Sequence, residues 1–208
     1  MADWKKRLKL PLYVMVHPVD GFLEMKYEKQ GRLWIALINM VLLWVSYIVQ
    51  KQYTGFALNS GDPADVNSLA DLAIIAAILL LFCTANWSVT TLTDGEGSFR
   101  DIAMAVGYAL TPINLIFIPA TLISRMMVEN EGSFFYLLIG LALLWSAMLL
   151  FMGIFSVHNY SVGKTLVTFL FTFAAMLVII FLLGLILSLL QQAFIFVKSV
   201  YQEIVFRQ

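Results

Sequence analysis

Few residues in this chain are of types that carry out nucleophilic, acid–base or metal chemistry. The 208-residue sequence contains two histidines, His17 and His158, and one cysteine, Cys83. Neither histidine has a metal-ligand spacing to the other histidine or to the cysteine. A lone cysteine excludes an intrachain disulfide and a multi-cysteine metal site, and we expect Cys83 to be a small packed side chain. We expect His158, which is followed by Asn159 and Tyr160, to be a solvated loop residue.

Motifs of common enzyme classes are also absent from the sequence. There is no Gly-x-Ser-x-Gly elbow, no phosphate-binding glycine loop and no His-Glu-x-x-His helix. Gly95-Glu96-Gly97 lacks the third glycine of a nucleotide fingerprint and predicts a turn. We therefore expect no catalytic residue, no cofactor and no metal, and the protein is not expected to be an enzyme.

Polar residues inside the hydrophobic runs are the best candidates for a site. Such side chains hydrogen-bond across helices and contribute on the order of 0.6–2 kcal/mol each. Two interpretations stay open. The residues either hold helices together, or they line a small cavity at a broken helix, as in transporters. The candidate packing or binding seam comprises Asn86, Thr90, Thr91, Gly107, Tyr108, Pro112 and Asn114.

Ionisable residues are missing from the middles of the hydrophobic runs. Asp71, Asp101, Arg125 and Lys164 fall near the ends of runs, where we expect them to meet lipid headgroups. Ion-coupled transporters usually carry ionisable groups inside their spans, so the pattern argues against a proton-coupled pump. The net charge of zero gives no electrostatic case for nucleic-acid binding.

The elements that must position these residues are long hydrophobic helices. The chain is 61% hydrophobic and 12% charged, whereas soluble domains carry about 25% charged residues. A spanning helix needs about 20 mostly apolar residues. The sequence therefore predicts an all-α polytopic membrane helical bundle with amphipathic segments at both ends. Its five transmembrane helices are predicted at residues 33–53, 69–91, 99–127, 134–157 and 164–190.

The two ends of the chain differ from the membrane domain, 33–190. Residues 1–32 mix basic and aromatic side chains, which suits an anionic membrane surface. Within them, residues 22–32 predict a short helix with Phe22, Leu23, Met25 and Tyr27 resting on the bilayer. Residues 191–208 show an amphipathic helical pattern. This tail either lies at an interface or against a partner, or extends the fifth span.

The third run, 99–127, is predicted to be irregular because it contains two prolines. Pro112 removes a backbone hydrogen bond and frees the carbonyl of Tyr108. A freed carbonyl in hydrocarbon needs a donor. We expect that donor to come from the second span, at Asn86, Thr90 or Thr91, with Gly107 letting the two helices approach. The alternative donor is water or the Thr111 hydroxyl.

The distribution of basic residues predicts the orientation of the chain. Seven of the 13 Lys and Arg residues precede the first span. With the N-terminus inside, nine basic residues lie inside and four outside, and cytoplasmic segments are enriched in Lys and Arg. We therefore expect a cytoplasmic N-terminus and, after five spans, a C-terminus outside.

Two segments carry a family resemblance. Gly97-Ser98-Phe99-Arg100, followed by Val106-Gly107-Tyr108-Ala109-Leu110-Thr111-Pro112, resembles the Gly-Tyr…Pro signature of the Yip (Ypt-interacting protein) family. The segment from His17-Pro18 through Phe22 to Lys26 is similar to the Pro…Phe…Lys segment of prokaryotic members. The resemblance covers residues 17 to 190. It implies five spans, a cytoplasmic N-terminus and a C-terminus outside or in the lumen.

The resemblance also implies a function. Eukaryotic members reside in Golgi and reticulum membranes and are linked to prenylated small GTPases. This chain lacks their long polar N-terminal region and their Asp-Leu-Tyr-Gly-Pro type of motif, which argues against a small-GTPase partner. It is more similar to the prokaryotic branch, which implies the plasma membrane. We expect a non-enzymatic scaffold or adaptor that contacts the lipid bilayer and binds a membrane protein or a second copy, or organises lipid. The alternative is a transporter or an accessory subunit of one.

Overall fold

The computed structural model describes residues 2–59, 61 and 66–206. Every regular element within those residues is a helix. Five helical segments are long and apolar enough to cross a membrane. The first four begin and end within about five residues of the predicted spans, and the fifth begins within two residues of its prediction but runs well beyond it. The predicted all-α, five-span fold is confirmed. The chain is an integral membrane protein.

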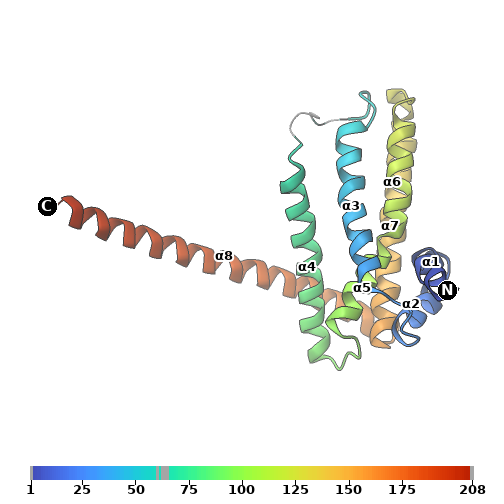
Figure 1. Cartoon of the computed structure of the whole chain (residues 1–208), viewed down its shortest axis with the longest axis horizontal. Coiled ribbons are helices and arrows are strands. Elements are labelled where there is room, and N and C mark those ends of the chain that lie inside the picture. Colours follow the sequence, from blue (N-terminus) through green and yellow to red (C-terminus); the bar gives the residue numbers. More distant parts are fainter. Residues whose placement is uncertain (1, 60, 62–65, 207–208) are drawn as a thin grey trace.

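Four of the spans form a bundle of roughly parallel and antiparallel helices (Figure 1). The first two are α3, Leu33–Tyr53, and α4, Ser68–Leu92. The fourth is α7, Gly132–His158, which follows the short 3-10 helix η2, Glu129–Glu131. The bundle therefore has two ends. We call the end where α3 begins and α4 and α7 finish the α2 end, after the helix that lies there.

The third span is broken into two helices. α5 runs over Phe99–Ala109 and α6 over Thr111–Ser124, with Leu110 between them. Pro112 sits in the first turn of α6, where its missing N–H interrupts no helical hydrogen bond. The predicted irregularity is thus a break at Leu110.

The N-terminal region folds into two helices that pack on the bundle. α1, Ala2–Val16, is followed by α2, Pro18–Lys26. Phe22 and Met25 are 0% and 1% exposed and belong to a core cluster with residues of α1, α3, α5 and α7. The prediction that they rest on the bilayer is therefore wrong, because this face of α2 packs on the bundle. Leu23 and Tyr27, on the other face, are exposed.

The fifth span is part of a much longer helix, α8, Val162–Phe206. Its first turns pack on α4 and α7, and Thr165, Thr168 and Thr172 are buried there. Beyond this contact α8 leaves the bundle, steeply inclined to the other spans (Figure 1). The tail from residue 191 continues α8 without a break. Of the two interpretations of the tail, the structure therefore agrees with the one in which it extends the fifth span.

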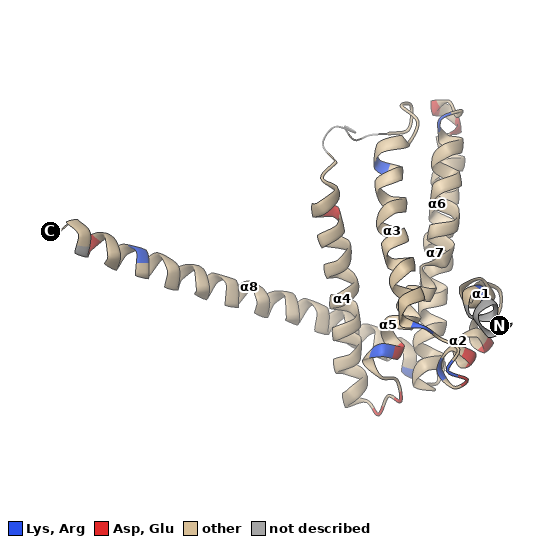
Figure 2. Cartoon of the chain, viewed as in Figure 1, with Lys and Arg blue, Asp and Glu red and all other residues tan. Residues whose placement is uncertain are grey.

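Charged residues gather near the two ends of the bundle and near the far end of α8 (Figure 2). Arg32 precedes α3, whereas Arg100 and Lys164 lie in the first turns of α5 and α8. All three positions fall at the α2 end. Lys51 and Arg125 lie at the opposite end, in the last turn of α3 and just after α6. This distribution fits helices that stand across a membrane.

Candidate functional site: the α2 end of the bundle

The residues of the predicted seam fall into two separate groups. The first group lies in α4. The Asn86 Nδ2 donates a hydrogen bond to the Thr172 hydroxyl of α8 at 3.1 Å. The hydroxyl of Thr90 donates to the Asn86 carbonyl at 2.8 Å, and that of Thr91, which is exposed, donates to the Trp87 carbonyl at 2.7 Å. Of this group, only Asn86 therefore joins α4 to α8, and the two threonines bond α4 itself.

The second group lies where α3 packs on α5 and α6. The Asn114 Nδ2 donates to the backbone carbonyl of Asn39 at 2.9 Å. The Asn39 Nδ2 in turn donates to the Thr111 hydroxyl at 3.4 Å. Gly107, Tyr108 and Pro112 are buried beside these residues. The structure brings Gly107, Tyr108, Pro112 and Asn114 together and leaves the three α4 residues elsewhere.

The carbonyl of Tyr108 receives its hydrogen bond from Thr111. The Thr111 hydroxyl donates to it at 2.6 Å. The expectation that Asn86, Thr90 or Thr91 supplies the donor is wrong, because their polar groups bond α4 itself or α8. The Tyr108 side chain is fully buried, and its hydroxyl accepts a hydrogen bond from the Arg32 N–H at 3.2 Å. Tyr108 therefore fixes the start of α3 relative to α5.

Gly107 is a point of close helix approach, but to a different helix from the expected one. A Cβ on Gly107 would lie 2.5 Å from the Ala36 Cβ and 2.7 Å from the Ala36 carbonyl oxygen. Ala36 belongs to α3, whereas we expected the second span, α4. Small residues at such a crossing let two backbones come into contact. The Gly-Tyr element therefore joins α5 to α3.

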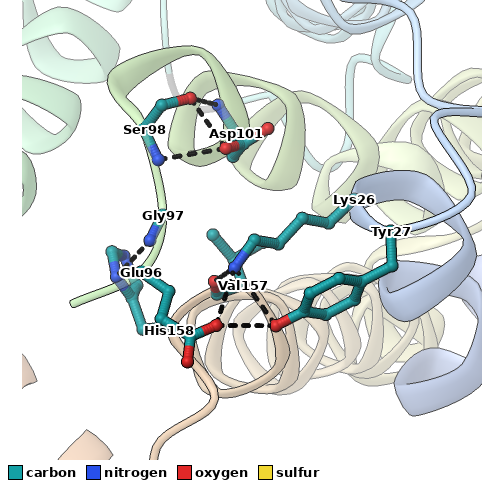
Figure 3. Close-up of polar contacts among 8 residues, drawn as sticks. All are labelled: Lys26, Tyr27, Glu96, Gly97, Ser98, Asp101, Val157 and His158. Atoms are coloured by element: carbon teal, nitrogen blue, oxygen red, sulfur yellow. Dashed lines mark hydrogen bonds and ion pairs between the residues drawn. The ribbon is translucent and has the colours of Figure 1, made fainter.

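His158 is buried, contrary to the prediction of a solvated loop residue. It ends α7 and is 1% exposed. Its Nδ1 accepts a hydrogen bond from the Gly97 N–H at 3.2 Å (Figure 3), and its ring stacks on Tyr160 with centroids 5.2 Å apart. The chain reverses at Asn159, which has a left-handed backbone with φ of 53°. This reversal lets Tyr160 and the α4–α5 loop enclose the imidazole.

The α4–α5 loop needs glycine for space at two positions. A Cβ on Gly95 would stand 2.5 Å from the His158 Nδ1 and 2.7 Å from the Tyr160 hydroxyl. A Cβ on Gly97 would stand 2.5 Å from the Val157 Cγ1. Neither glycine has a positive φ, so the requirement is steric. The two glycines let this loop pack closely against the end of α7.

A polar cluster ties α2 to this loop and to α7 (Figure 3). The Lys26 ammonium donates to the Val157 carbonyl at 2.7 Å and lies 3.4 Å from the Glu96 carboxylate. The Tyr27 hydroxyl donates to the same carboxylate at 2.8 Å. The pKa of the Glu96 carboxyl is therefore below its ordinary value. The hydrogen bond from Tyr27 is the largest cause, and Lys26 is the second. A cation at the last carbonyls of a helix also stabilises the negative end of its dipole, here the end of α7.

Sequence reasoning missed this cluster because its members come from three distant segments. Glu96 and Lys26 are 70 residues apart, and Lys26 and Val157 are 131 residues apart. One local signal was available. Gly95 and Gly97 flank a single residue, and glycine occurs where another group approaches the backbone closely.

A pocket of about 340 Å³ opens between α1 and α2. It is lined by two tyrosines, one leucine and three carboxylate residues, namely Tyr13, Tyr27, Leu23, Asp20, Glu24 and Glu28. Asp20 and Glu24 are four residues apart in α2 and share one face of this helix, and Glu28 lies in the turn that follows it. The pocket therefore has an acidic and partly aromatic lining.

At the opposite end of the bundle, Asp71 forms an ion pair. It is 8% exposed, and its Oδ1 lies 2.9 Å from the Lys51 ammonium. The expectation that Asp71 meets lipid headgroups is wrong, because Lys51 of α3 reaches it across the α3–α4 contact. Within the described residues, no group of three or more His, Cys, Asp and Glu side chains could hold a metal ion.

The comparisons with known proteins give one match. A family model described as the Yip1 domain matches residues 12–194, which is most of the chain. It includes the α2 end, the Gly107–Pro112 element and most of α8. No curated protein matches the chain, and no solved structure does.

Proposed function

The chain belongs to the Yip1 family of membrane proteins, and on this basis we propose that it is a non-enzymatic scaffold or adaptor that binds other membrane proteins or organises lipid. We place it in the plasma membrane with its N-terminus in the cytoplasm. The α2 end then faces the cytoplasm. Its five helices long and apolar enough to cross a membrane agree with a role within the bilayer.

One observation carries the protein-binding form of the proposal, namely the pocket between α1 and α2. Its carboxylates and tyrosines suit a partner with Lys or Arg side chains. Membrane proteins carry an excess of Lys and Arg in their cytoplasmic segments. The pocket lies at the end of the bundle that the basic residues assign to the cytoplasm, so a basic cytoplasmic segment of another membrane protein fits it.

The pocket is suited to binding because its walls are held in place. The α2 wall is fixed by Lys26, which contacts both Val157 and Glu96. The α1 wall is fixed by Leu10 and Val14, which are buried in the core cluster. A preformed site loses less conformational freedom when a partner binds.

Co-purification tests this proposal. The full chain is extracted in mild detergent and its co-purifying proteins are identified. A double variant, Asp20→Asn with Glu28→Gln, removes two carboxylates from the pocket and should lose the partner. The matched control, Asp94→Asn with Glu129→Gln, removes one Asp and one Glu away from the pocket and should retain it. Absence of any stoichiometric protein from the parent preparation would contradict the adaptor form.

The lipid-organising form rests on the exposed apolar surface of the N-terminal helix. Leu8, Leu12 and Val16 of α1 are exposed at intervals of four residues, so they form one stripe. Basic residues fill the first half of the same helix. Apolar and basic residues on one helix favour the surface of an anionic bilayer. We expect the N-terminal region of the full chain to bind anionic lipid but not neutral lipid. High salt should release it from the anionic lipid.

Transport is the alternative function, and the break between α5 and α6 is the place that could support it. There the side chains of Asn39, Thr111 and Asn114 bond one another and the α3 backbone, which fills the interface. We therefore retain transport, or an accessory role in it, as the weaker candidate. A small molecule that co-purifies in place of a protein would favour it.

A further inference from the structure

The helix α8 is longer than a bilayer is thick. A helix rises about 1.5 Å per residue, so the 45 residues of α8 extend roughly 68 Å. By the same rule α3 and α4, with 21 and 25 residues, extend roughly 32 and 38 Å. The hydrocarbon core of a typical bilayer is about 30 Å thick. The other spans therefore match a bilayer when they stand upright, and α8 does not.

Most of the length of α8 lacks charged side chains. No charged residue and no histidine occurs between Lys164 and Lys198, a run of 33 residues that extends roughly 50 Å. The run contains no proline, so nothing in it kinks the helix. Its last four residues, Phe194 to Val197, are all apolar and surround the helix. Gln191 and Gln192 are its strongly polar side chains, and the rest of the run favours a hydrocarbon environment.

Only the beginning of this run is covered by protein. The Thr172 hydroxyl accepts the hydrogen bond from Asn86, and Phe169 packs on Phe82 of α4 and on Phe151 of α7. From Phe181 onward every described side chain of α8 is exposed. α8 is therefore anchored at its start on α4, and its remainder extends from the bundle without a protein contact in the described chain.

We propose that α8 crosses the bilayer at a steep tilt, covered on all sides by lipid acyl chains, and that its tilt follows the thickness of the hydrocarbon. A run of roughly 50 Å fits inside about 30 Å of hydrocarbon when it tilts well beyond the average of about 20°. The steep inclination of α8 to the upright spans agrees with this requirement (Figure 1). This inference rests on the lipid-organising form of the proposed function.

The distribution of apolar residues identifies lipid as the main occupant. A partner helix covers one stripe of α8, whereas the exposed apolar residues of the stretch from Leu177 to Val197 lie on every side of the helix. Gly184 meets no atom within 4 Å of its added Cβ position. Lipid acyl chains can cover the apolar side chains on all sides of α8 at once. A helix that is longer than the hydrocarbon is thick adapts to the bilayer thickness by tilting.

Spin-label distances in bilayers of different thickness test the proposal. The full chain, with Cys83→Ala to remove the native thiol, carries one label at Leu69→Cys and one at Leu190→Cys. Both native side chains are exposed, so the labels leave the packing intact. The protein is reconstituted in phosphatidylcholine whose monounsaturated chains have fourteen, eighteen or twenty-two carbons. We expect the distance to shorten with each increase in thickness, in total by on the order of one helical pitch, about 5 Å.

A matched pair provides the control. Labels at Leu69→Cys and Leu137→Cys report on α4 and α7, both upright and both exposed at these positions. Their distance should stay constant in all three bilayers. A constant Leu69–Leu190 distance would overturn the proposal. So would a strong distance signal from protein labelled at Leu190→Cys alone, because a second copy would then cover α8. Neither result depends on whether a protein partner binds the α1–α2 pocket.

Discussion

Gly107 of α5 lies in direct contact with Ala36 of α3, and a Cβ on this glycine would stand 2.5 Å from the Ala36 Cβ. The Ala36 Cα and carbonyl oxygen would be equally close, at 2.7 Å each. The contact thus involves backbone that cannot rotate away. It sits one residue before Tyr108, whose hydroxyl accepts a hydrogen bond from the Arg32 N–H. The two residues together fix how α3 and α5 cross.

Gly107→Ala should destabilise the protein. Overpacking of a tight contact costs typically 1–3 kcal/mol, and here the added methyl meets backbone. The control is Gly140→Ala in α7, where a Cβ meets nothing within 4 Å. Because alanine favours a helix over glycine, the control should melt at or above the parent temperature. Equal melting of both variants in detergent would show that α3 and α5 do not need the glycine.

Thr111→Val should destabilise the break between α5 and α6. It removes the side-chain donor to the Tyr108 carbonyl and the acceptor of the Asn39 Nδ2, and a buried polar group that loses its partner costs about 1–3 kcal/mol. Thr111→Ser keeps the hydroxyl and should restore most of the stability. Thr84→Val is the control, because the Thr84 hydroxyl is exposed and bonds its own helix. The measurement is thermal unfolding followed by circular dichroism, and an equal effect of both valine variants would refute the role of Thr111.

Gly95→Ala should loosen the α4–α5 loop from α7. The methyl group would displace His158 and Tyr160, so the Gly97 N–H would lose its acceptor, the His158 Nδ1. We expect faster hydrogen exchange at the Gly97 amide and a lower melting temperature. Gly163→Ala is the matched control, since a Cβ there meets nothing within 4 Å. Unchanged exchange at Gly97 in the Gly95 variant would contradict the packing described here.

Contact of α2 with the loop should weaken in acid. The pKa of Glu96 is lowered in the folded protein by Tyr27 and Lys26. A lowered carboxyl pKa stabilises the fold above the unfolded pKa, and the contribution is lost as pH falls through the folded pKa. Hydrogen exchange across residues 18–26 should therefore increase below about pH 4, near the ordinary Glu value. The Glu96→Gln variant should lose this pH dependence.

The charge of Lys26 gives a second readout of the same contact. Lys26→Met removes the ion pair and the bond to the Val157 carbonyl, so exchange across residues 18–26 should rise at neutral pH as well. Lys29→Met is the control, because Lys29 is exposed in the following turn. Added salt should reduce part of the difference, because the Glu96 side of the ion pair is exposed to solvent and therefore screened. A Lys26 variant that exchanges like the control would exclude this anchoring role.

The orientation of the chain remains a prediction, and reporter fusions measure it. A reporter that is active only in the cytoplasm should be active at the N-terminus and silent at the C-terminus. The reason is the excess of Lys and Arg at the α2 end combined with five spans. Activity of the C-terminal fusion would mean that α8 returns to the cytoplasm or never crosses, and the five-span orientation would have to be abandoned.

Several features of this protein follow from the sequence alone. The spans are determined by long uncharged runs, because a backbone in hydrocarbon must satisfy its hydrogen bonds within each helix. The requirement is local, and the predicted and observed bounds of the first span coincide at Leu33 and Tyr53. The break near Pro112 is also local, because in a continuous helix the proline ring would clash with the carbonyl four residues earlier. The sequence also predicted a close helix approach at Gly107, because membrane helices pack closely at small residues.

The tertiary structure decided which surfaces meet. The sequence around Gly107 predicts a close helix contact but does not say whether the neighbour is α3 or α4. Only the folded structure shows that the neighbour is Ala36 of α3. His158 stands beside a turn, which favours solvent, yet a loop about 60 residues earlier encloses it. Burial of a polar side chain depends on partners from distant segments, and no local pattern specifies them. The joining of Lys26, Glu96 and Val157 is therefore a property of the folded chain.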